Sequence, residues 1–565
     1  MKTEIRPEKR NPLISQQMNS TSQPLSRRDF LCLGAIGAVG TLLGHSRLSV
    51  AWPAKAASSS ARPHIILIMS DDMGYSDVGC YGSEIETPTL NRLAADGVRF
   101  TQFYNAARCC PTRASLMTGL YPHQAGLGHM VSDRGPEGYK GRLNERCVTI
   151  AEVLRQAGYQ TFMSGKWHVT PYDYANPKST LDRESWPLQR GFDEFFGTLA
   201  GAGSFYAPVS LMRNNEFIEP GDDFYYTDAI NDQAARYIRQ ADKNRPLFLY
   251  VAHTAPHWPL HAPEETIAKY ADTYTVGWDA IRQSRYKRMV EMGIIQSDWP
   301  LTERDSRVPP WDEVDHKDWQ ARRMAVHAAM VEVMDRGIGR IVEALKETGR
   351  FENTLILFLS DNGASNEVIQ GQDTRHGRFA RGGTRPDVMP GPPDTYASFG
   401  IPWANASNTP FRLYKKWIHE GGIATPLIAH WPAGIKAKNQ WRHEIGHVVD
   451  IMATCVEISG ATYPAERNGV PVTPCEGVSL TPVFAGKPLP RRAVFFEHEG
   501  NRAVRFGRWK LTAEHQKSWE LYDMQADRTE TNNLIDRHPE PALLMEALYE
   551  QWAKRTGVLP WPVQG

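Results

Sequence analysis

The chain alternates continuous apolar runs with segments in which apolar residues recur at helical spacing. An unbroken apolar run of about six residues is typical of a strand that is covered on both faces of its sheet. Such runs are found at His64–Ser70, Leu247–Ala252, Leu355–Ser360 and Pro426–His430. Helical spacing predicts helices at Pro88–Asp96, Thr149–Ala157, Ala325–Thr348 and His447–Ile458. The alternation therefore predicts an α/β fold in which a large, mostly parallel sheet is sandwiched by helices.

The pattern changes from Arg492 onward, where short strands follow one another. An antiparallel meander followed by a helix is predicted, with these bounds: Val494–Glu499, Arg502–Leu511 and Trp519–Met524 for the strands, and Ala542–Lys554 for the helix. We therefore expect a functional α/β domain over residues 62–485 and a small α+β subdomain over residues 486–565. Two long insertions, 262–320 and 364–412, are expected to be irregular loops at the rim of the functional site.

Residues 1–57 are predicted to be an export signal. Arg27 and Arg28 precede an apolar, glycine-rich run that ends at Leu43. This run of about 14 residues is too short to span a bilayer. Small residues then surround Lys55, as a signal peptidase requires. The order resembles a twin-arginine signal, which implies export of the folded chain by the twin-arginine translocase to the periplasm or the medium.

Composition restricts the classes of function. The sequence contains 64 Lys and Arg against 64 Asp and Glu, so no net charge recruits nucleic acid or a membrane surface. The region after residue 57 has no apolar run long enough to insert stably into a membrane. Seven cysteines in 565 residues are too few for a disulfide framework. An anionic ligand must therefore be held by a local cluster of cationic side chains.

Polar residues follow the predicted strands at the point where each strand ends. They are Asp71 and Asp72, Lys166 and His168 after the segment Thr161–Ser164, His253 and His257, and Asp361 and Asn362. Taken singly, each aspartate pair is explained as a helix cap or a turn. In a parallel sheet, however, all of these residues meet at one edge. The oxygen ligands suit Ca²⁺ or Mg²⁺ rather than zinc, and the lysine and histidines suit an anionic group beside the metal.

A cysteine-containing segment is the most specific motif. Vicinal Cys109 and Cys110 near Arg113 could be a redox pair, a low-pKa nucleophile or two buried thiols. The run from Cys109 to Gly119, CCPTRASLMTG, contains Cys-x-Pro-x-Arg followed by Leu-Met-Thr-Gly. This pattern resembles the signature of the type I sulfatase family, which has an alkaline-phosphatase-like fold. Thr112 stands where the family more often has serine.

The resemblance implies the site residues. In this family a maturing enzyme oxidises the signature cysteine to formylglycine, and the spacing to Pro111 and Arg113 selects Cys109. The resemblance assigns Asp71, Asp72, Asp361 and Asn362, together with residue 109, to one Ca²⁺ ion, with Mg²⁺ as the alternative. It assigns Arg113 to anchoring residue 109, and Lys166, His168, His257 and Lys415 to the sulfate. Lys416 competes with Lys415 for the last role. The run Trp403–Trp417 is most similar to bacterial calcium-binding arylsulfatases, whose C-terminal part is a four-stranded sheet and a helix.

The implied activity is hydrolysis of an aryl or carbohydrate sulfate by a hydrated formylglycine. His168 is then the expected base and His257 the acid or hydrogen-bond donor to the leaving oxygen. Lys166 and His168 are one residue apart, so an extended segment places both side chains on one face. Two alternatives remain: a phosphate or phosphonate ester hydrolase on the same fold, and a non-catalytic, calcium-dependent binder of sulfated glycans. The segment Glu497–Asn501 either reaches the substrate or is a plain strand turn.

Overall fold

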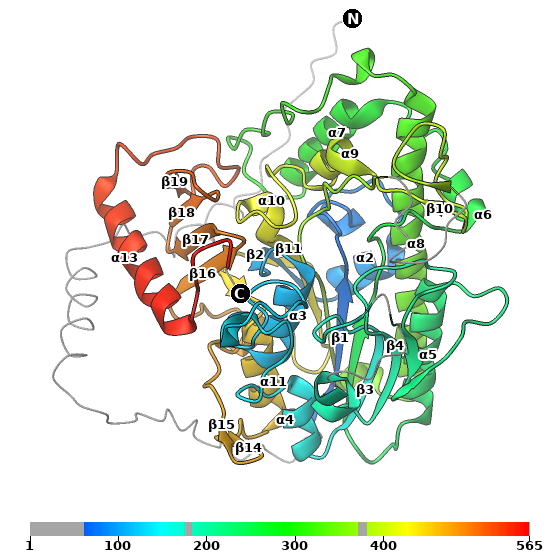
Figure 1. Ribbon diagram of the computed structural model, residues 1–565, viewed down its shortest axis with the longest axis vertical. Coiled ribbons are helices and arrows are strands. Elements are labelled where there is room, and N and C mark those ends of the chain that lie inside the picture. The colour runs from blue at the N-terminus through cyan, green and yellow to red at the C-terminus, as the bar shows by residue number, and fades with distance from the viewer. Residues whose placement is uncertain (1–61, 174–175, 177–182, 371–380, 564–565) are drawn as a thin grey trace, which may run out of the picture. The chain divides into compact units, whose positions relative to one another are not determined.

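The central strand β1 (His64–Ser70) shows why this sequence forms a two-sided sheet. Its side chains alternate between two buried apolar clusters, with Ile66 and Ile68 in one and Ile65, Leu67 and Met69 in the other. Strand side chains point alternately to opposite faces, so a run that is apolar at every position must be covered on both. The computed structural model describes residues 62–173, 176, 183–370 and 381–563 (Figure 1). The predicted export signal therefore lies outside the described residues.

The large sheet has eleven strands among the described residues, and the strands at its centre are parallel. Strand β1 pairs in parallel with β7 and β8, and β7 pairs in parallel with β3. The path across the sheet is β12 (Gln440–Arg442), β2 (Val98–Tyr104), β11 (Ala424–His430), β8 (Thr354–Ser360), β1, β7 (Leu247–Ala252), β3 (Gln160–Lys166), β4 (Glu194–Thr198), β5 (Leu211–Arg213) and β6 (Glu216–Phe217), with β13 (Gly446–His447) beside β2. Because β11 runs antiparallel to β2 and β8, the sheet is mixed. The predicted fold class is confirmed.

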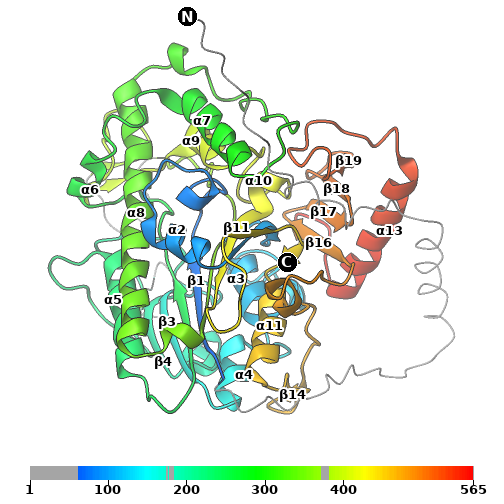
Figure 2. The same cartoon turned by 180° about the vertical axis from the view of Figure 1, so that it is seen from behind.

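Helices cover both faces of this sheet (Figures 1 and 2). One layer contains α2 (Pro88–Ala95), α5 (Tyr226–Gln240) and α8 (Lys317–Glu347), and α8 contacts both others. The other layer contains α3 (Cys109–Thr118), α4 (Ile150–Gln156) and α11 (Asp450–Ser459), with α11 against α3 and α4. Helix α4 begins with a capping box, in which Thr149 and Glu152 satisfy each other's backbone N–H groups. Among the described residues, no helix combines the length and the apolar character needed to cross a membrane.

The C-terminal part contains four antiparallel strands and a helix. They are β16 (Ala493–His498), β17 (Asn501–Phe506), β18 (Trp509–Ala513), β19 (Glu520–Asp523) and α13 (Pro539–Thr556). The single strand predicted at Arg502–Leu511 is wrong. It is two strands, because Gly507 takes a φ of 57° and turns the chain between Phe506 and Trp509.

The insertion 262–320 is not irregular, so that prediction is also wrong. It contains α6 (Glu264–Ala268) and α7 (Gly277–Glu291), and α8 begins at Lys317 rather than at Ala325. Helix α7 was not predicted from apolar spacing, because Arg282 and Arg285 occupy buried positions where apolar residues are expected. The insertion 364–412 contains β9 (Arg381–Gly382), β10 (Thr395–Tyr396) and α9 (Gly400–Ser407). The other short α-helices and strands among the described residues are α10 (Glu420–Ile423), α12 (Thr481–Phe484), β14 (Glu466–Arg467) and β15 (Val470–Pro471).

Candidate active site

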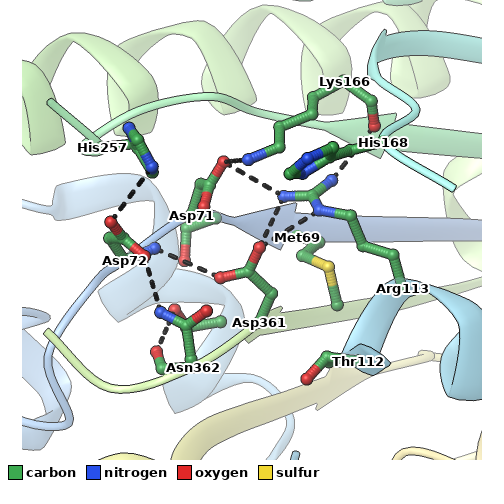
Figure 3. Close-up of polar contacts among 12 residues, drawn as sticks. Met69, Asp71, Asp72, Thr112, Arg113, Lys166, His168, His257, Asp361 and Asn362 are labelled. Carbon is green, nitrogen blue, oxygen red and sulfur yellow. Dashed lines mark hydrogen bonds and ion pairs between the residues drawn. The ribbon is translucent and has the colours of Figure 1, made fainter. Parts of the chain in front are cut away.

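Four neighbouring parallel strands deliver the predicted polar residues to one edge of the sheet. Asp71 and Asp72 follow β1, Asp361 and Asn362 follow β8, Lys166 ends β3, and His257 follows β7. Since β8, β1, β7 and β3 are consecutive neighbours, their carboxyl ends are adjacent. Figure 3 shows these side chains pointing toward one another across the strand ends.

The acidic cluster at this edge is buried and internally bonded. The side chains of Asp71, Asp72, Asp361 and Asn362 are at most 1% exposed. The amide of Asn362 donates to Oδ1 of Asp72 at 2.6 Å, and the backbone N–H of Asp72 donates to Oδ1 of Asp361 at 3.2 Å. Ligand atoms of Asp71, Cys109 and Asp361 lie within 4.8 Å of one another. Asp72 adopts a φ of 61°, a left-handed conformation that is uncommon for residues other than glycine.

These residues fit a hard divalent cation. Oδ1 of Asp71 and Oδ1 of Asn362 are buried and lack a hydrogen-bond partner among the described residues. Burial and the neighbouring Asp71 raise the pKa of Asp361 well above its ordinary value, and burial raises the pKa of Asp71 to about 6. Crowded carboxylates and orphaned oxygens are stabilised by Ca²⁺ or Mg²⁺, which prefer oxygen ligands.

Arg113 connects this cluster to the helix that carries the signature motif. Its guanidinium donates to Oδ2 of Asp361 at 2.8 and 3.1 Å, and lies 3.4 Å from Oδ2 of Asp71. A further donation reaches the carbonyl of Lys166 at 3.1 Å. The Arg113 side chain is completely buried, so its charge is balanced by carboxylates rather than by water.

Cys109 is the first residue of α3, and the chain turns immediately before it. Arg108 is extended, and Ala107 before it takes a φ of 62°. The hydroxyl of Thr112 accepts the backbone N–H of Ala106 at 2.9 Å, which explains why a threonine can replace the serine common at this position. A hydrogen bond with Cys110 and the Lys166 and Lys415 cations lower the pKa of the Cys109 thiol well below its ordinary value, although burial opposes them.

Lys166 and His168 approach this centre differently from the prediction. Lys166 forms a buried ion pair with Oδ2 of Asp71. His168 has a φ of 52°, so the expectation of an extended segment is wrong at this residue. Its Nε2 lies 3.3 Å from Sγ of Cys110, and its ring packs where Gly201 has no side chain. Burial lowers the pKa of His168 to about 3, with a further contribution from Lys166.

His257 and Lys415 lie together on the Asp72 side of the cluster. Nζ of Lys415 is 2.9 Å from Oδ2 of Asp72 and 3.4 Å from Nε2 of His257. Nδ1 of His257 is 2.5 Å from the carbonyl of Trp258, to which it donates. Burial lowers the pKa of His257 to about 4, so the ring is neutral and its Nε2 accepts the hydrogen bond from Nζ of Lys415. Lys416 points elsewhere: its Nζ lies 3.7 Å from Glu499.

Sequence reasoning missed a carboxylate in this site. Glu367 contacts Lys415, Arg108 and Trp258. Its only signal was its position in the insertion 364–412, which was predicted to form a rim. Two tryptophans that flank site residues have partners of their own: Trp167 is buried and donates to the carbonyl of Ser185, and Trp417 donates to Glu514.

Two further predicted segments lie outside the cluster. His253 is buried, and its Nε2 lies 3.0 Å from Oδ1 of Asn231, consistent with a structural role. The turn Glu497–Asn501 connects β16 and β17. Its Asn501 amide donates to the carbonyl of Lys416 at 3.3 Å, so this turn supports the lysine segment from the C-terminal sheet.

A buried acidic cluster, a cysteine at a helix N-terminus and two buried lysines define the class of this protein. On the carboxyl edge of a parallel sheet, they form the site of an ester hydrolase that acts on anionic esters. The sulfatase family model matches residues 63–461, and a model described as N-sulphoglucosamine sulphohydrolase, C-terminal, matches residues 411–556. The chain belongs to the sulfatase family and is a sulfuric ester hydrolase.

The chain is similar to known sulfatases along most of its length. An uncharacterized sulfatase of Schizosaccharomyces pombe is 34% identical over 551 residues, which cover 89% of this chain and 96% of that protein. An arylsulfatase of Klebsiella aerogenes is 34% identical over 466 residues, which cover 77% of this chain and 95% of that protein. The crystal structure of Ps i-CgsB in complex with k-i-k-neocarrahexaose is 25% identical, with a TM-score of 0.63, and the match covers 87% of this chain and 93% of that one.

Proposed function

We propose that this chain hydrolyses an aryl or carbohydrate sulfate to an alcohol and inorganic sulfate, with residue 109 as formylglycine. The observation that carries this proposal is the placement of Cys109 at the N-terminus of α3, within 4.8 Å of ligand atoms of Asp71 and Asp361. Formylglycine supplies a hydrated aldehyde whose hydroxyl serves as the nucleophile. Its formation from Cys109 requires a sulfatase-maturing enzyme as a partner.

The metal proposal assigns Asp71, Asp72, Asp361 and Asn362, together with residue 109, to one Ca²⁺ ion, with Mg²⁺ as the alternative. A bound divalent cation supplies a Lewis acid beside residue 109. The two unpartnered oxygens, Oδ1 of Asp71 and Oδ1 of Asn362, support this assignment. Arg113 holds Asp71 and Asp361 in place through its guanidinium.

The remaining residues act on the sulfuryl group and on protons. Lys166 and Lys415 neutralise negative charge on the sulfuryl oxygens, because both are buried cations at the cluster. The neutral ring of His168 is assigned as the base that takes a proton from the sulfated intermediate when it releases sulfate. His257 is assigned as the hydrogen-bond donor to the leaving oxygen, a role that requires a proton at Nε2, the nitrogen that lies 3.4 Å from Nζ of Lys415.

The test is sulfate release by protein produced together with a maturing enzyme. Cys109→Ala is expected to abolish release while the protein still folds, and Cys110→Ala is expected to retain most of it. Mass spectrometry of the peptide that contains Cys109 should show the thiol replaced by an aldehyde at position 109 alone. Modification at Cys110, or full activity of Cys109→Ala, would contradict the assignment.

The same experiment separates the alternatives. A phosphate or phosphonate ester hydrolase would turn over phosphate esters faster than matched sulfate esters. A calcium-dependent binder of sulfated glycans would retain binding but release no sulfate from any ester. The Cys109 thiol beside Asp71 and Asp361 favours the hydrolase, since a binder needs cations for the sulfate but no nucleophile.

We also propose that residues 1–57 direct export through the twin-arginine translocase, to the periplasm or the medium, and that the mature chain consists of domains 62–485 and 486–565. The test replaces Arg27 and Arg28 with lysine in a bacterial host. Retention of the variant in the cytoplasm is expected, and unchanged export would contradict the proposal.

A further inference from the structure

Glu367 is bound by four groups at the edge of the active site. Its Oε2 accepts hydrogen bonds from Nε1 of Trp258 at 2.8 Å, from Oγ of Ser365 at 3.1 Å and from Nζ of Lys415 at 3.2 Å. Its Oε1 accepts from Nη2 of Arg108 at 3.1 Å. Two of these four donors are cations, so the position of this carboxylate is firmly determined.

Glu367 lies on the solvent side of a lysine of the active site. Nζ of Lys415 is held between Oδ2 of Asp72 at 2.9 Å and Oε2 of Glu367 at 3.2 Å. The Asp72 and Lys415 side chains are 1% and 2% exposed, whereas that of Glu367 is 30% exposed. A substrate group that extends from the reacting centre toward solvent on this side therefore passes Lys415 and then meets the Glu367 carboxylate.

The charge on Glu367 is retained. Burial opposes its ionisation, but the Lys415 and Arg108 cations outweigh that effect and hold the pKa of Glu367 below its ordinary value. The glutamate is therefore an anion throughout the neutral pH range, and its field acts on any charged group that approaches.

The Arg108 cation beside Glu367 is also neutralised by carboxylates of the protein. Arg108 directly precedes Cys109 and pairs with Glu367. The Glu499 carboxylate adds to the negative charge around Arg108, and it lies 3.7 Å from Nζ of Lys416. Among the described residues, Arg108 and Lys416 thus both face carboxylates of the protein.

We propose that Glu367 is a specificity-determining residue that restricts this site to sulfate esters of neutral alcohols. The inference rests on the proposed function and deepens it. An ester that carries a second anion beside the sulfate meets the Glu367 carboxylate, and it can reach Arg108 only by displacing a carboxylate with four hydrogen bonds. The substrate class is then a monosulfated phenol or a sugar without a neighbouring acidic group, rather than a densely sulfated glycan.

The experiment compares two aryl sulfates of nearly the same shape, 4-sulfooxybenzamide, which is neutral at the para position, and 4-sulfooxybenzoate, which is anionic there. The measured quantity is the ratio of their kcat/KM values. The wild-type protein should prefer the benzamide by about tenfold, and Glu367→Gln should reduce this preference by about fivefold, because one nearby charge is removed. The change should fall mainly on KM for the benzoate, and Glu367→Asp, which keeps the charge, should keep the preference.

The matched control is Glu347→Gln at the end of α8, an exposed residue that pairs with Arg239 at 2.8 Å. It makes the same change in net charge and should leave the ratio unchanged. An unchanged ratio in Glu367→Gln, or an equal change in both variants, overturns the inference while the proposed function stands. If the matured wild type releases sulfate neither from these esters nor from any carbohydrate sulfate, the proposed function fails and this inference falls with it.

A second measurement needs no variant. Partly exposed charges are screened by salt, so raising the ionic strength from about 0.05 to 0.5 M should shrink the wild-type preference for the benzamide. A preference that is absent, reversed or independent of salt also overturns the inference. If Glu367→Gln does not fold, the salt dependence of the wild type still tests the proposal.

Discussion

Nζ of Lys510 lies 2.9 Å from Oε1 of Glu420, and both side chains are completely buried. The pair joins β18 of the C-terminal sheet to α10, which begins five residues after Lys415. Lys510 forms a second ion pair, with Oε1 of Glu530 at 2.7 Å, and Nε of Arg528 donates to Glu420 at 2.9 Å. The C-terminal sheet therefore fixes the segment that supplies a lysine to the active site.

Replacing Lys510 by methionine should destabilise the fold strongly. The change removes the cation that pairs with both Glu420 and Glu530, and an uncompensated buried charge costs about 3–5 kcal/mol. Urea unfolding monitored by circular dichroism measures the loss. Lys438→Met is the control, because Lys438 pairs with Asp96 at the surface, where an ion pair contributes about 0–1 kcal/mol. Equal effects of the two variants would show that the buried network does not stabilise the fold.

The two adjacent lysines should differ in their effect on turnover. Lys415→Met should lower kcat/KM for an aryl sulfate by about 100-fold or more, because a buried cation at the sulfuryl group is lost. Lys416→Met should change it by less than about fivefold, since Lys416 is partly exposed and pairs with Glu499. Steady-state kinetics on the matured proteins decide the matter, and a larger effect at Lys416 would reverse the assignment.

Metal content should depend on the acidic cluster and not on buried carboxylates in general. One Ca²⁺ or Mg²⁺ per chain is expected by elemental analysis, and Asp361→Asn should lose most of it. Asp335→Asn is the matched control: Asp335 is also buried, but it accepts the backbone N–H groups of Thr89 and Leu90 in the helical layer. Stoichiometric zinc, or full metal content in Asp361→Asn, would refute the proposed site.

Stability should fall on acidification because His261 is buried as a neutral ring. Its Nε2 donates to the carbonyl of Thr395 at 2.7 Å, and its Nδ1 accepts the N–H of Phe205 at 3.4 Å. Burial lowers the pKa of His261 from 6.5 to about 4, although Thr395 and Asp394 oppose the shift. Between these two pKa values, His261 binds a proton in the unfolded chain but not in the folded chain. Stability is therefore lost as the pH falls from 6.5 toward 4.

Between pH 7 and pH 5 this single group accounts for about 2 kcal/mol of lost stability. His261→Gln should be less stable at pH 7, and its unfolding free energy should depend less on pH over this interval. Urea titrations at the two pH values provide the measurement. His538→Gln, at an exposed position, should leave the pH dependence of the wild type unchanged. The same slope in His261→Gln as in the wild type would refute the assignment.

Local patterns predicted much of the fold, and tertiary contacts explain the exceptions. The runs that became β1, β7 and β8 are apolar at every position because both faces of the sheet are covered. Strand β2 was not predicted because Arg99, Thr101 and Gln102 interrupt its apolar pattern. The sheet tolerates these polar residues because segments at its edge bond to Arg99 and Gln102. Helix α7 was missed for a related reason, since its buried Arg285 is balanced by Asp77 and Glu84 from a distant segment.

The sequence by itself determined the residue types of the active site and the edge on which they gather. Asp71, Asp72, Asp361 and Asn362 follow apolar strands directly, so a parallel order of those strands was enough to bring them together. Only the tertiary structure decided which lysine, Lys415 or Lys416, enters the site, and that Glu367 stands beside it. The physical reason is that a local apolar run encodes a strand covered on both faces, whereas the direction of a loop side chain depends on groups hundreds of residues away, such as Asp72 for Lys415.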